Sequence, residues 1–578
     1  RDGSGQAVAT AEYRTDGGKV RSLKAWIVPP SGPARQLSNK ASVDLSLAGN
    51  DMVNEARAIS LSGEDDAVPG STFAWETLVE RRAAFAQFEW YFQDGLPTLK
   101  SEFTFRPQPG WSVRAAMMNA DSLAPRVADG LWTWSRAELG AIPNEAYSPP
   151  LSSLAARLVV GASPPPGSPP ETMRTFGDWA EVSAWLHQAA EPNGLPTPAI
   201  EAKARQVTSR AATTNEKIRA VAEYCQSVNY ISIQMGLSRG GGYIPHAADE
   251  VLRRGYGDCK DKSNLMRAML RSLGIESYLC AISAFDPDYV TPSWPTPGQF
   301  NHCIVAARSD DSAACAIESP SLGRLVLFDP TDIATRWGSL PDPEQGGLAL
   351  LIAPAGGALI RVPVAPPDRG RHRRRYEASV APDGSIAGRV EIVASGSSAA
   401  MWRMRSRERG SAGLANAPDL WLCSAVATAA VDSFAQSDPP DDDRYRIRAA
   451  FRIPKFGRTM GGRLIILETG RLTTMEVTLP SQASRSLPMR IPRFAGSDIV
   501  RLTLPPGYAL EGTPAPVAIE GPYGRYTATV RVEGDEVAIE RVTELPRSIV
   551  PAAKSAEVRD FLLRVKRALD TPLVLAKK

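Results

Sequence analysis

Hydrophobic and polar positions alternate with a period close to two along the first part of the chain. Runs such as KVRSLKAWIVPP, STFAWETLVE and LKSEFTFRP are rich in β-branched and aromatic residues, and turns separate them at a spacing typical of an antiparallel sandwich. We therefore expect an N-terminal β-rich domain over residues 1–161. The proline-rich run ASPPPGSPP cannot sustain a helix or a central strand, so it predicts a linker and helical connector over residues 162–196.

After this linker the hydrophobic period changes to about three and a half. The segments TFGDWAEVSAWLHQ, PAIEAKARQVTSRA and NEKIRAVAEYCQSV are predicted helices, the last with Thr213 or Thr214 as its N-cap. In that helix Cys225 shares a face with Ile218 and Val221. Cys225 is therefore predicted to be a core thiol.

Strand patterns return after residue 365. The segment RYEASVAPDGSIAGRVEIVAS has the outline of a hairpin that turns at Asp383 and Gly384. The segment APDLWLCSAVATAAVDSF, residues 417–434, is predicted to be a helical insertion with Cys423 on its apolar face. A closing helix is predicted from SAEVRDFLLRVKRAL.

These patterns predict an α+β protein with a core domain over residues 197–364 and a C-terminal β-rich domain over residues 365–578. With 578 residues the chain is too long for a single core. Its 43% hydrophobic and 22% charged residues are those of an ordinary folded protein, which argues against disorder.

The charge pattern gives no case for nucleic acid or an anionic membrane as a partner, because the formal net charge is only +3. The most apolar stretch, LALLIAPAGGALIRVPVAP, is interrupted by Pro354, two glycines and Arg361, so no membrane span is predicted. The chain begins with Arg1, which is compatible with removal of a native leader.

Cysteine and histidine spacing argues against a metal site. Neither the six cysteines nor the four histidines form a C-x-x-C or H-E-x-x-H pattern, and six cysteines in so long a chain do not make a disulfide framework. We therefore expect no metal and no cofactor.

One cysteine stands at the start of an amphipathic segment, GYGDCKDKSNLMRAMLRSLG, residues 255–274. On a helical projection Cys259 lies close to the centre of the apolar stripe that contains Met266 and Leu270, and Gly274 is a plausible helix terminator. Free backbone N–H groups and the positive end of the helix dipole favour a thiolate at this position. Cys259 is therefore the most readily activated cysteine of the chain.

Both neighbouring aspartates, Asp258 and Asp261, would oppose a thiolate. They are expected to cap the helix or to pair with Lys260 and Lys262.

A base and an orienting carboxylate follow downstream. His302 opens the strand-like run QFNHCIVAAR, and Asp329 ends the run RLVLFDPTD, with Asp332 as a competing carboxylate. The order helix, strand, strand allows Cys259, His302 and Asp329 to meet at the rim of a small antiparallel sheet packed on the helix. There His302 would take the thiol proton and Asp329 would hold the imidazole tautomer.

Three further positions leave alternatives open. Cys303 should face the opposite side of its strand from His302, as a core residue or as a disulfide partner of Cys280. His246 follows a proline in a glycine-rich loop and lies either at the surface or toward a substrate.

The segments RRGYGDCKDKSNLMRAMLRSLGIESYLCAI, FNHCIVA and LFDPTD resemble the core of the transglutaminase-like superfamily, which is papain-like in its Cys–His–Asp order. The flanking segments resemble those of bacterial proteins in which this core lies between two β-rich, β-sandwich-like domains of uncharacterised function. The resemblance implies an acyl-transfer site at Cys259, His302 and Asp329. It also implies an oxyanion site formed by the cysteine N–H and an upstream side chain, for which Gln234 and Tyr243 are the candidates.

This resemblance implies a secreted or periplasmic, cysteine protease-like hydrolase that cleaves an amide in a peptide or protein through a thioester. Transfer to an amine, as in a cross-linking transglutaminase, is the first alternative. The second is a non-catalytic binding or scaffold protein that retains the fold and docks protein partners through its β-rich domains.

Overall fold

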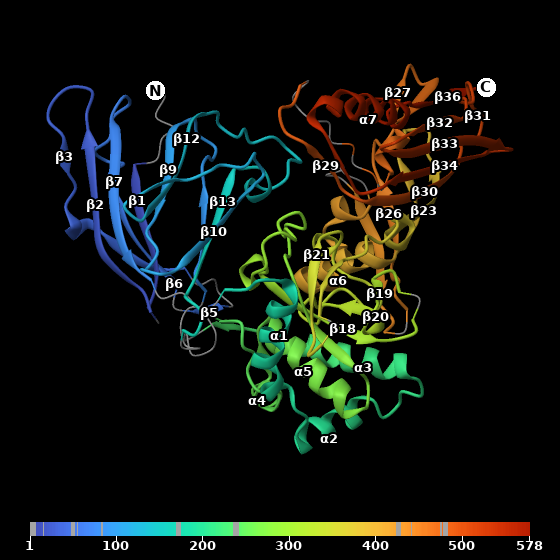
Figure 1. The fold of residues 1–578 in the computed structure, drawn as a ribbon. Coiled ribbons are helices and arrows are strands. Elements are labelled where there is room, and N and C mark those ends of the chain that lie inside the picture. The colour runs from blue at the N-terminus through green and yellow to red at the C-terminus, as the bar shows by residue number, and fades with distance from the viewer. Residues whose placement is uncertain are drawn as a thin grey trace.

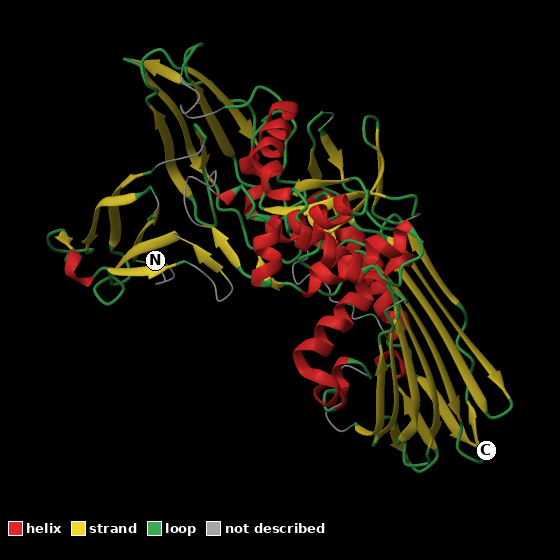
Figure 2. Ribbon diagram, turned by 90° about the horizontal axis from the view of Figure 1, so that it is seen from below, coloured by secondary structure: helices red, strands yellow, loops and turns green. Residues whose placement is uncertain are grey.

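The computed structural model describes residues 7–15, 17–47, 52–54, 56–81, 85–168, 175–234, 242–311, 313–355, 357–422, 429–440, 442–473, 475, 477 and 484–578. Helices gather in the centre of the molecule, and β-rich regions extend from it on two sides (Figures 1 and 2). This arrangement confirms the predicted α+β class, with β-rich regions on either side of the core.

Short antiparallel sheets build the N-terminal region. Small apolar cores hold them together, one around Leu23 and Leu61 and another around Phe92, Trp134 and Leu158. The sheets, in order of neighbouring strands, are β1 (Val8–Arg14), β6 (Ala56–Ser62) and β4 (Val43–Ser46); β3 (Arg35–Gln36), β2 (Lys19–Val28) and β7 (Thr72–Glu80); β11 (Arg126–Ala128), β12 (Leu131–Leu139) and β9 (Thr98–Phe105); and β10 (Ser112–Met118), β13 (Arg157–Ser163) and β8 (Gln87–Tyr91).

The central helices lie where the three-and-a-half-residue period predicts them. Thr213 is the N-cap of α3 and forms a capping box with Glu216, which satisfies free N–H groups at the helix start. Gly274 adopts a left-handed φ of 73° after α5 and ends it as predicted. The helices are α1 (Trp179–Ala190), α2 (Pro198–Val207), α3 (Thr214–Ser227), α4 (Ala248–Arg254) and α5 (Cys259–Ser272); α4 was not predicted.

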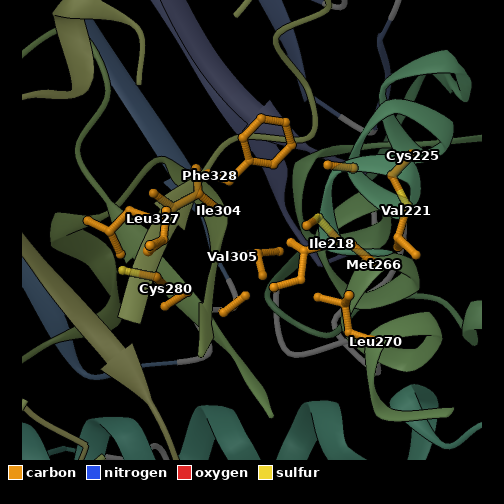
Figure 3. Packing of buried hydrophobic residues seen from close by; sticks show 14 of the residues in the cluster. Ile218, Val221, Cys225, Met266, Leu270, Cys280, Ile304, Val305, Leu327 and Phe328 are labelled. Carbon is orange, nitrogen blue, oxygen red and sulfur yellow. The ribbon is translucent and has the colours of Figure 1, made fainter. Parts of the chain in front are cut away.

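A six-stranded antiparallel sheet is the centre of the core. Its strand order is β19 (Ala316–Ser319), β20 (Gly323–Phe328), β18 (His302–Arg308), β17 (Ser277–Ile282), β21 (Leu348–Ile352) and β22 (Leu359–Arg361). Apolar side chains of α3 and α5 pack against those of the sheet, and Cys225 is fully buried among them, as predicted (Figure 3). A second apolar cluster joins β17 and β21 to α1. Helices therefore cover both faces of this sheet.

An eight-stranded sheet is the largest sheet described in the C-terminal region. The predicted hairpin is present, since β23 and β24 pair in antiparallel fashion and Gly384 has a φ of 80° in the turn. The strand order is β25 (Ala430–Ser437), β26 (Tyr445–Ile453), β24 (Ile386–Ala394), β23 (Arg371–Val380), β30 (Phe494–Thr503), β34 (Glu536–Leu545), β33 (Gly524–Glu533) and β32 (Val517–Gly521). The closing helix is α7 (Ser555–Leu569).

Smaller sheets complete this region. One contains β27 (Arg458–Met460), β28 (Leu464–Leu467), β36 (Leu573–Lys577) and β31 (Tyr508–Leu510), and the other contains β29 (Met489–Ile491) and β35 (Ser548–Val550).

The predicted helical insertion at residues 417–434 is wrong. The helix of this region is α6 (Gly396–Ala415), and Ala430–Ser437 is the strand β25, which pairs with β26. Hydrogen bonding to a neighbouring strand outweighs the local helical pattern there. Cys423 lies outside the described residues.

Strands from distant parts of the chain meet beside the first turn of α5. The short strand β14 (Asn229–Tyr230) pairs in parallel with β16 (Tyr256–Gly257), which ends two residues before Cys259. Likewise β5 (Met52–Asn54), from the N-terminal region, pairs in parallel with β15 (Ser232–Gln234). In the described part of the chain, no helix has the length and apolar character that crossing a membrane requires.

Candidate active site

Cys259 is the first residue of α5, and its side chain is partly exposed. Asp258 is the N-cap and accepts a bond from the N–H of Asp261 at 3.3 Å, while the Asp261 carboxylate accepts one from the N–H of Asp258 at 3.3 Å. Lys260 forms an ion pair with Asp258. The expected capping role of both aspartates is therefore confirmed. The carboxylates of both aspartates are thus engaged in hydrogen bonds or an ion pair. The N–H of Cys259 lies in the first turn of the helix, so it has no partner within α5.

His246 helps to fix the start of this helix. Its Nδ1 atom lies 2.9 Å from Oδ2 of Asp261, and its backbone N–H donates to Oδ1 at 2.7 Å. The side chain is largely buried, so the surface position considered from the sequence is wrong.

His302 and Asp329 meet at the rim of the sheet. The Nε2 atom of His302 lies 3.1 Å from Oδ2 of Asp329. Asp329 is held in turn by Thr331, whose hydroxyl donates to its carboxylate at 2.7 Å and whose N–H donates at 2.8 Å. Asp332 instead accepts bonds from Thr335 and the N–H of Ala334, so it is not the partner of His302.

The electrostatics of the site favour a charged imidazole. Burial alone disfavours the imidazolium, but hydrogen bonds to Asp329 and Cys259, and their charges, raise the pKa of His302 well above its ordinary value. Burial likewise acts to raise the pKa of Asp329, but the bond from His302 outweighs it and lowers that pKa. Because Nε2 faces Asp329, Nδ1 is the nitrogen left for the thiol. The imidazolium form of His302 is therefore the form that these contacts stabilise.

The other described cysteines lack such a partner. Burial raises the pKa of Cys225 to about 12 and that of Cys315 to about 12, and it raises the pKa of Cys280 as well. Cys303 and Cys280 are both free thiols. They belong to apolar clusters on opposite faces of the sheet, so the disulfide considered between them is not present.

A cavity of about 310 Å³ opens beside the thiol, and Cys259, His302 and Tyr243 are part of its wall. Burial raises the pKa of Tyr243 to about 12, so its hydroxyl keeps its proton at neutral pH. Tyr243 is therefore a protonated side chain in the wall of this cavity. Gln234 ends β15, and its side chain lies outside the described part of the structure.

Tyr230 and Glu344 are part of this neighbourhood but were missed from the sequence. Burial and the negative charges of Cys259 and Asp258 raise the pKa of Tyr230. The hydroxyl of Tyr230 therefore interacts electrostatically with Cys259. The Oε1 atom of Glu344 lies 3.9 Å from Nε2 of His302. Neither residue has a sequence signal of its own, because each lies in or beside a loop rather than at the end of a predicted strand.

The surroundings of Glu344 favour the protonated form of its carboxyl group. It is buried, and burial together with the charge of Asp329 raises its pKa well above the ordinary value. Its Oε2 atom has no hydrogen-bond acceptor or donor among the described residues. A neutral carboxyl group at this position can donate to Asp329 and hold it against His302.

His302, Asp329 and Glu344 could also hold a divalent cation, since one ligand atom from each lies within 4.8 Å of the others. Nitrogen and carboxylate oxygen are suitable ligands for zinc. A cation bound there would take Nε2 of His302 away from its bond with Asp329. These side chains can therefore either bind a cation or keep the bond between His302 and Asp329, but not both at once.

Replacement of Glu344 distinguishes these roles. We expect Glu344→Gln, whose amide still donates to Asp329, to retain most of the rate of amide cleavage expected of this site, and Glu344→Ala to lose about tenfold. The rates are measured with peptidyl aminomethylcoumarin amides, before and after EDTA. A wild-type rate that EDTA abolishes, or equal losses in both variants, would contradict the assignment of a neutral acid.

The core that carries these residues is transglutaminase-like. Residues 201–312, which include Cys259 and His302, match the family model described as the transglutaminase-like superfamily. Residues 464–575 match a domain of unknown function, DUF3858.

Solved structures are similar to the chain as well. One, described as "a putative protease from Parabacteroides distasonis", is 13% identical, with a TM-score of 0.63 over 99% of this chain and 92% of that chain. Another, described as "a putative cysteine protease from Cytophaga hutchinsonii", is 12% identical over 48% of this chain and 83% of that chain, with a TM-score of 0.20. No curated protein matches the chain. The long structural match extends the similarity of fold over all three regions.

Proposed function

We propose that this chain is a thiol hydrolase that cleaves an amide bond in a peptide or protein. One observation carries the proposal: His302 lies between a cysteine at a helix N-terminus and a buried aspartate. That arrangement supplies a nucleophile, a base and an orienting group, which acyl transfer requires together.

In the first half of the reaction, Nδ1 of His302 takes the proton of Cys259 and the thiolate attacks the amide carbonyl carbon. The carbonyl π electrons move to oxygen and form an oxyanion. When the tetrahedral intermediate collapses, His302 gives its proton to the departing amine, and the acyl group stays on Cys259 as a thioester. Asp329 holds the ring and its charge throughout.

The oxyanion needs hydrogen-bond donors that are already in place. The N–H of Cys259 at the start of α5 is one, and the helix dipole adds a favourable potential there. Tyr243 or Gln234 would supply the second donor. Tyr243 is the better supported of the two, because it lies in the wall of the same cavity.

In the second half, His302 takes a proton from water, and the resulting hydroxide attacks the thioester. Collapse releases the carboxylic acid and regenerates the Cys259 and His302 pair. We choose water rather than an amine as the acceptor because one structurally similar protein is described as a protease.

A competition between acceptors tests this assignment. The protein is incubated with a peptidyl aminomethylcoumarin amide and an excess of monodansylcadaverine, and the acyl products are identified by mass spectrometry. We expect the free acid as the main product. A dansylated product in the majority would make the chain a transglutaminase, and the absence of both products across a varied peptide set would favour a binding protein that retains the fold.

A further inference from the structure

The cavity beside Cys259 extends away from the thiol into the layer between α1 and the central sheet. Leu186 and Ala190 of α1 form one wall, and Leu279 and Ile352, from β17 and β21, form the facing one. Phe300 lies between them and the site, two residues before His302. The cavity is thus continuous with the reacting groups.

The lining changes character along this cavity. Its polar side chains include those of His302, Asn301, Lys260 and Tyr243; Lys260 follows Cys259 in the chain, and its charge is paired with Asp258. Beyond them the described lining carries no charged side chain, and its members belong to the buried apolar cluster under α1. A substrate group that enters this end meets mainly apolar side chains and the sulfur of Cys303, with the Tyr243 hydroxyl as a polar group in the same wall.

We infer that this cavity binds one large apolar side chain of the substrate, next to the amide that Cys259 attacks. The inference rests on the proposed function, because it gives the substrate class of the same site. A volume of about 310 Å³ is at the lower end of the range of ligand pockets. It suits a phenylalanine or leucine side chain rather than a whole ligand.

The same lining disfavours a glutamine side chain. An amide carried into the apolar end would lose its bonds to water and would find no charged side chain and few polar groups in the described lining to replace them, and incompletely paired polar groups are disfavoured. Peptide hydrolysis beside an apolar residue therefore fits the cavity better than reaction at a glutamine side chain.

Phe285 is an exposed apolar side chain that follows Ala284, a residue bonded to Asn301 of the cavity wall. It is 76% exposed and has a φ of 71°, a rare and costly conformation for a bulky residue. The preceding Ala284 bonds through both its N–H and its C=O to the side chain of Asn301, at 2.7 and 3.1 Å. Asn301 lies in the cavity wall, so its bonds to Ala284 connect the backbone next to Phe285 with that wall.

Alkylating probes test the cavity without requiring turnover. The second-order rates of Cys259 are compared for N-benzyl chloroacetamide and a polar N-(3-amino-3-oxopropyl) chloroacetamide of similar length, with peptide mapping to assign the product. Because burial of a phenyl group in an apolar pocket is favourable, we expect the benzyl probe to react about 10- to 100-fold faster, with saturation at high concentration.

Variants of α1 link that ratio to the cavity. Ala190→Phe fills the space, so we expect the ratio to fall toward one, whereas the matched control Ala202→Phe, on an exposed face of α2, leaves it unchanged. Leu186→Ala enlarges the space and is expected to shift the preference to an N-naphthylmethyl probe. If Ala190→Phe does not fold, the probe preference of Leu186→Ala tests the cavity assignment instead.

The outcomes separate this inference from the proposed function. If Cys259 reacts selectively but the wild-type ratio lies within twofold of one, or the ratio survives in both α1 variants, the cavity assignment is overturned and the hydrolase proposal stands. If Cys259 reacts with either probe no faster than Cys225, the proposed function fails and the inference falls with it.

Discussion

Replacement of Cys259 by alanine is expected to lower kcat/KM for amide hydrolysis by about 1000-fold or more. Without the thiol no thioester forms, and the remaining donors and the cavity stabilise only a direct attack by water. The measurement is the initial rate with peptidyl aminomethylcoumarin amides, with folding checked by circular dichroism and thermal unfolding.

Cys225→Ala is the matched control for this replacement. Cys225 is fully buried between α3 and α5 and has no base beside it, so we expect its loss to leave kcat/KM within about twofold. Retention of a tenth or more of the rate in Cys259→Ala would contradict the assignment of the nucleophile.

Replacement of Asp329 by alanine is expected to lower kcat/KM by about 100-fold and to change its pH dependence. The imidazolium form of His302 must protonate the leaving amine, so activity is lost as the pH rises through the pKa of His302. Asp329 raises that pKa, so the alkaline limb of the wild-type pH profile, where kcat/KM falls, should lie at a pH well above the ordinary histidine pKa. Without Asp329 the same limb should move to lower pH. The measurement is kcat/KM between about pH 5 and 10.

Asp332→Ala controls for the loss of a nearby carboxylate. Asp332 caps a local turn and has no bond to His302, so this variant should keep the wild-type alkaline limb. An unchanged limb in Asp329→Ala, or the same shift in both variants, would mean that Asp329 does not set the charge of His302.

Local sequence signals predicted α2, α3 and α5 of the core, but not α4 or all the elements of the flanks. For α5, an apolar stripe, acidic caps and Gly274 all agree, and the helix begins and ends where they indicate. Residues 417–434 carry an alanine-rich pattern that is typical of a helix, but pairing with β26 gives a strand from Ala430. Contacts between distant segments are not visible in such local patterns.

The same distinction applies to the site. Cys259, His302 and Asp329 each lie at the end of an element, so their convergence could be predicted from the order of helix and strands. Glu344 reaches His302 from a short loop segment, PDPEQGG, which reads as an ordinary polar turn. Only the packing of the core shows that this acid is buried and next to Asp329.

Trapping of the acyl-enzyme tests the central claim most directly. Wild-type protein and Cys259→Ala are mixed with 4-nitrophenyl 3-phenylpropanoate, quenched in acid and compared by intact mass and peptide mapping. We predict that one 3-phenylpropanoyl group is bound to wild-type protein at Cys259, is released by neutral hydroxylamine, and is absent from the variant. An equal acyl adduct on Cys259→Ala, or an adduct mapped to another residue of the wild type, would contradict a thioester mechanism at Cys259.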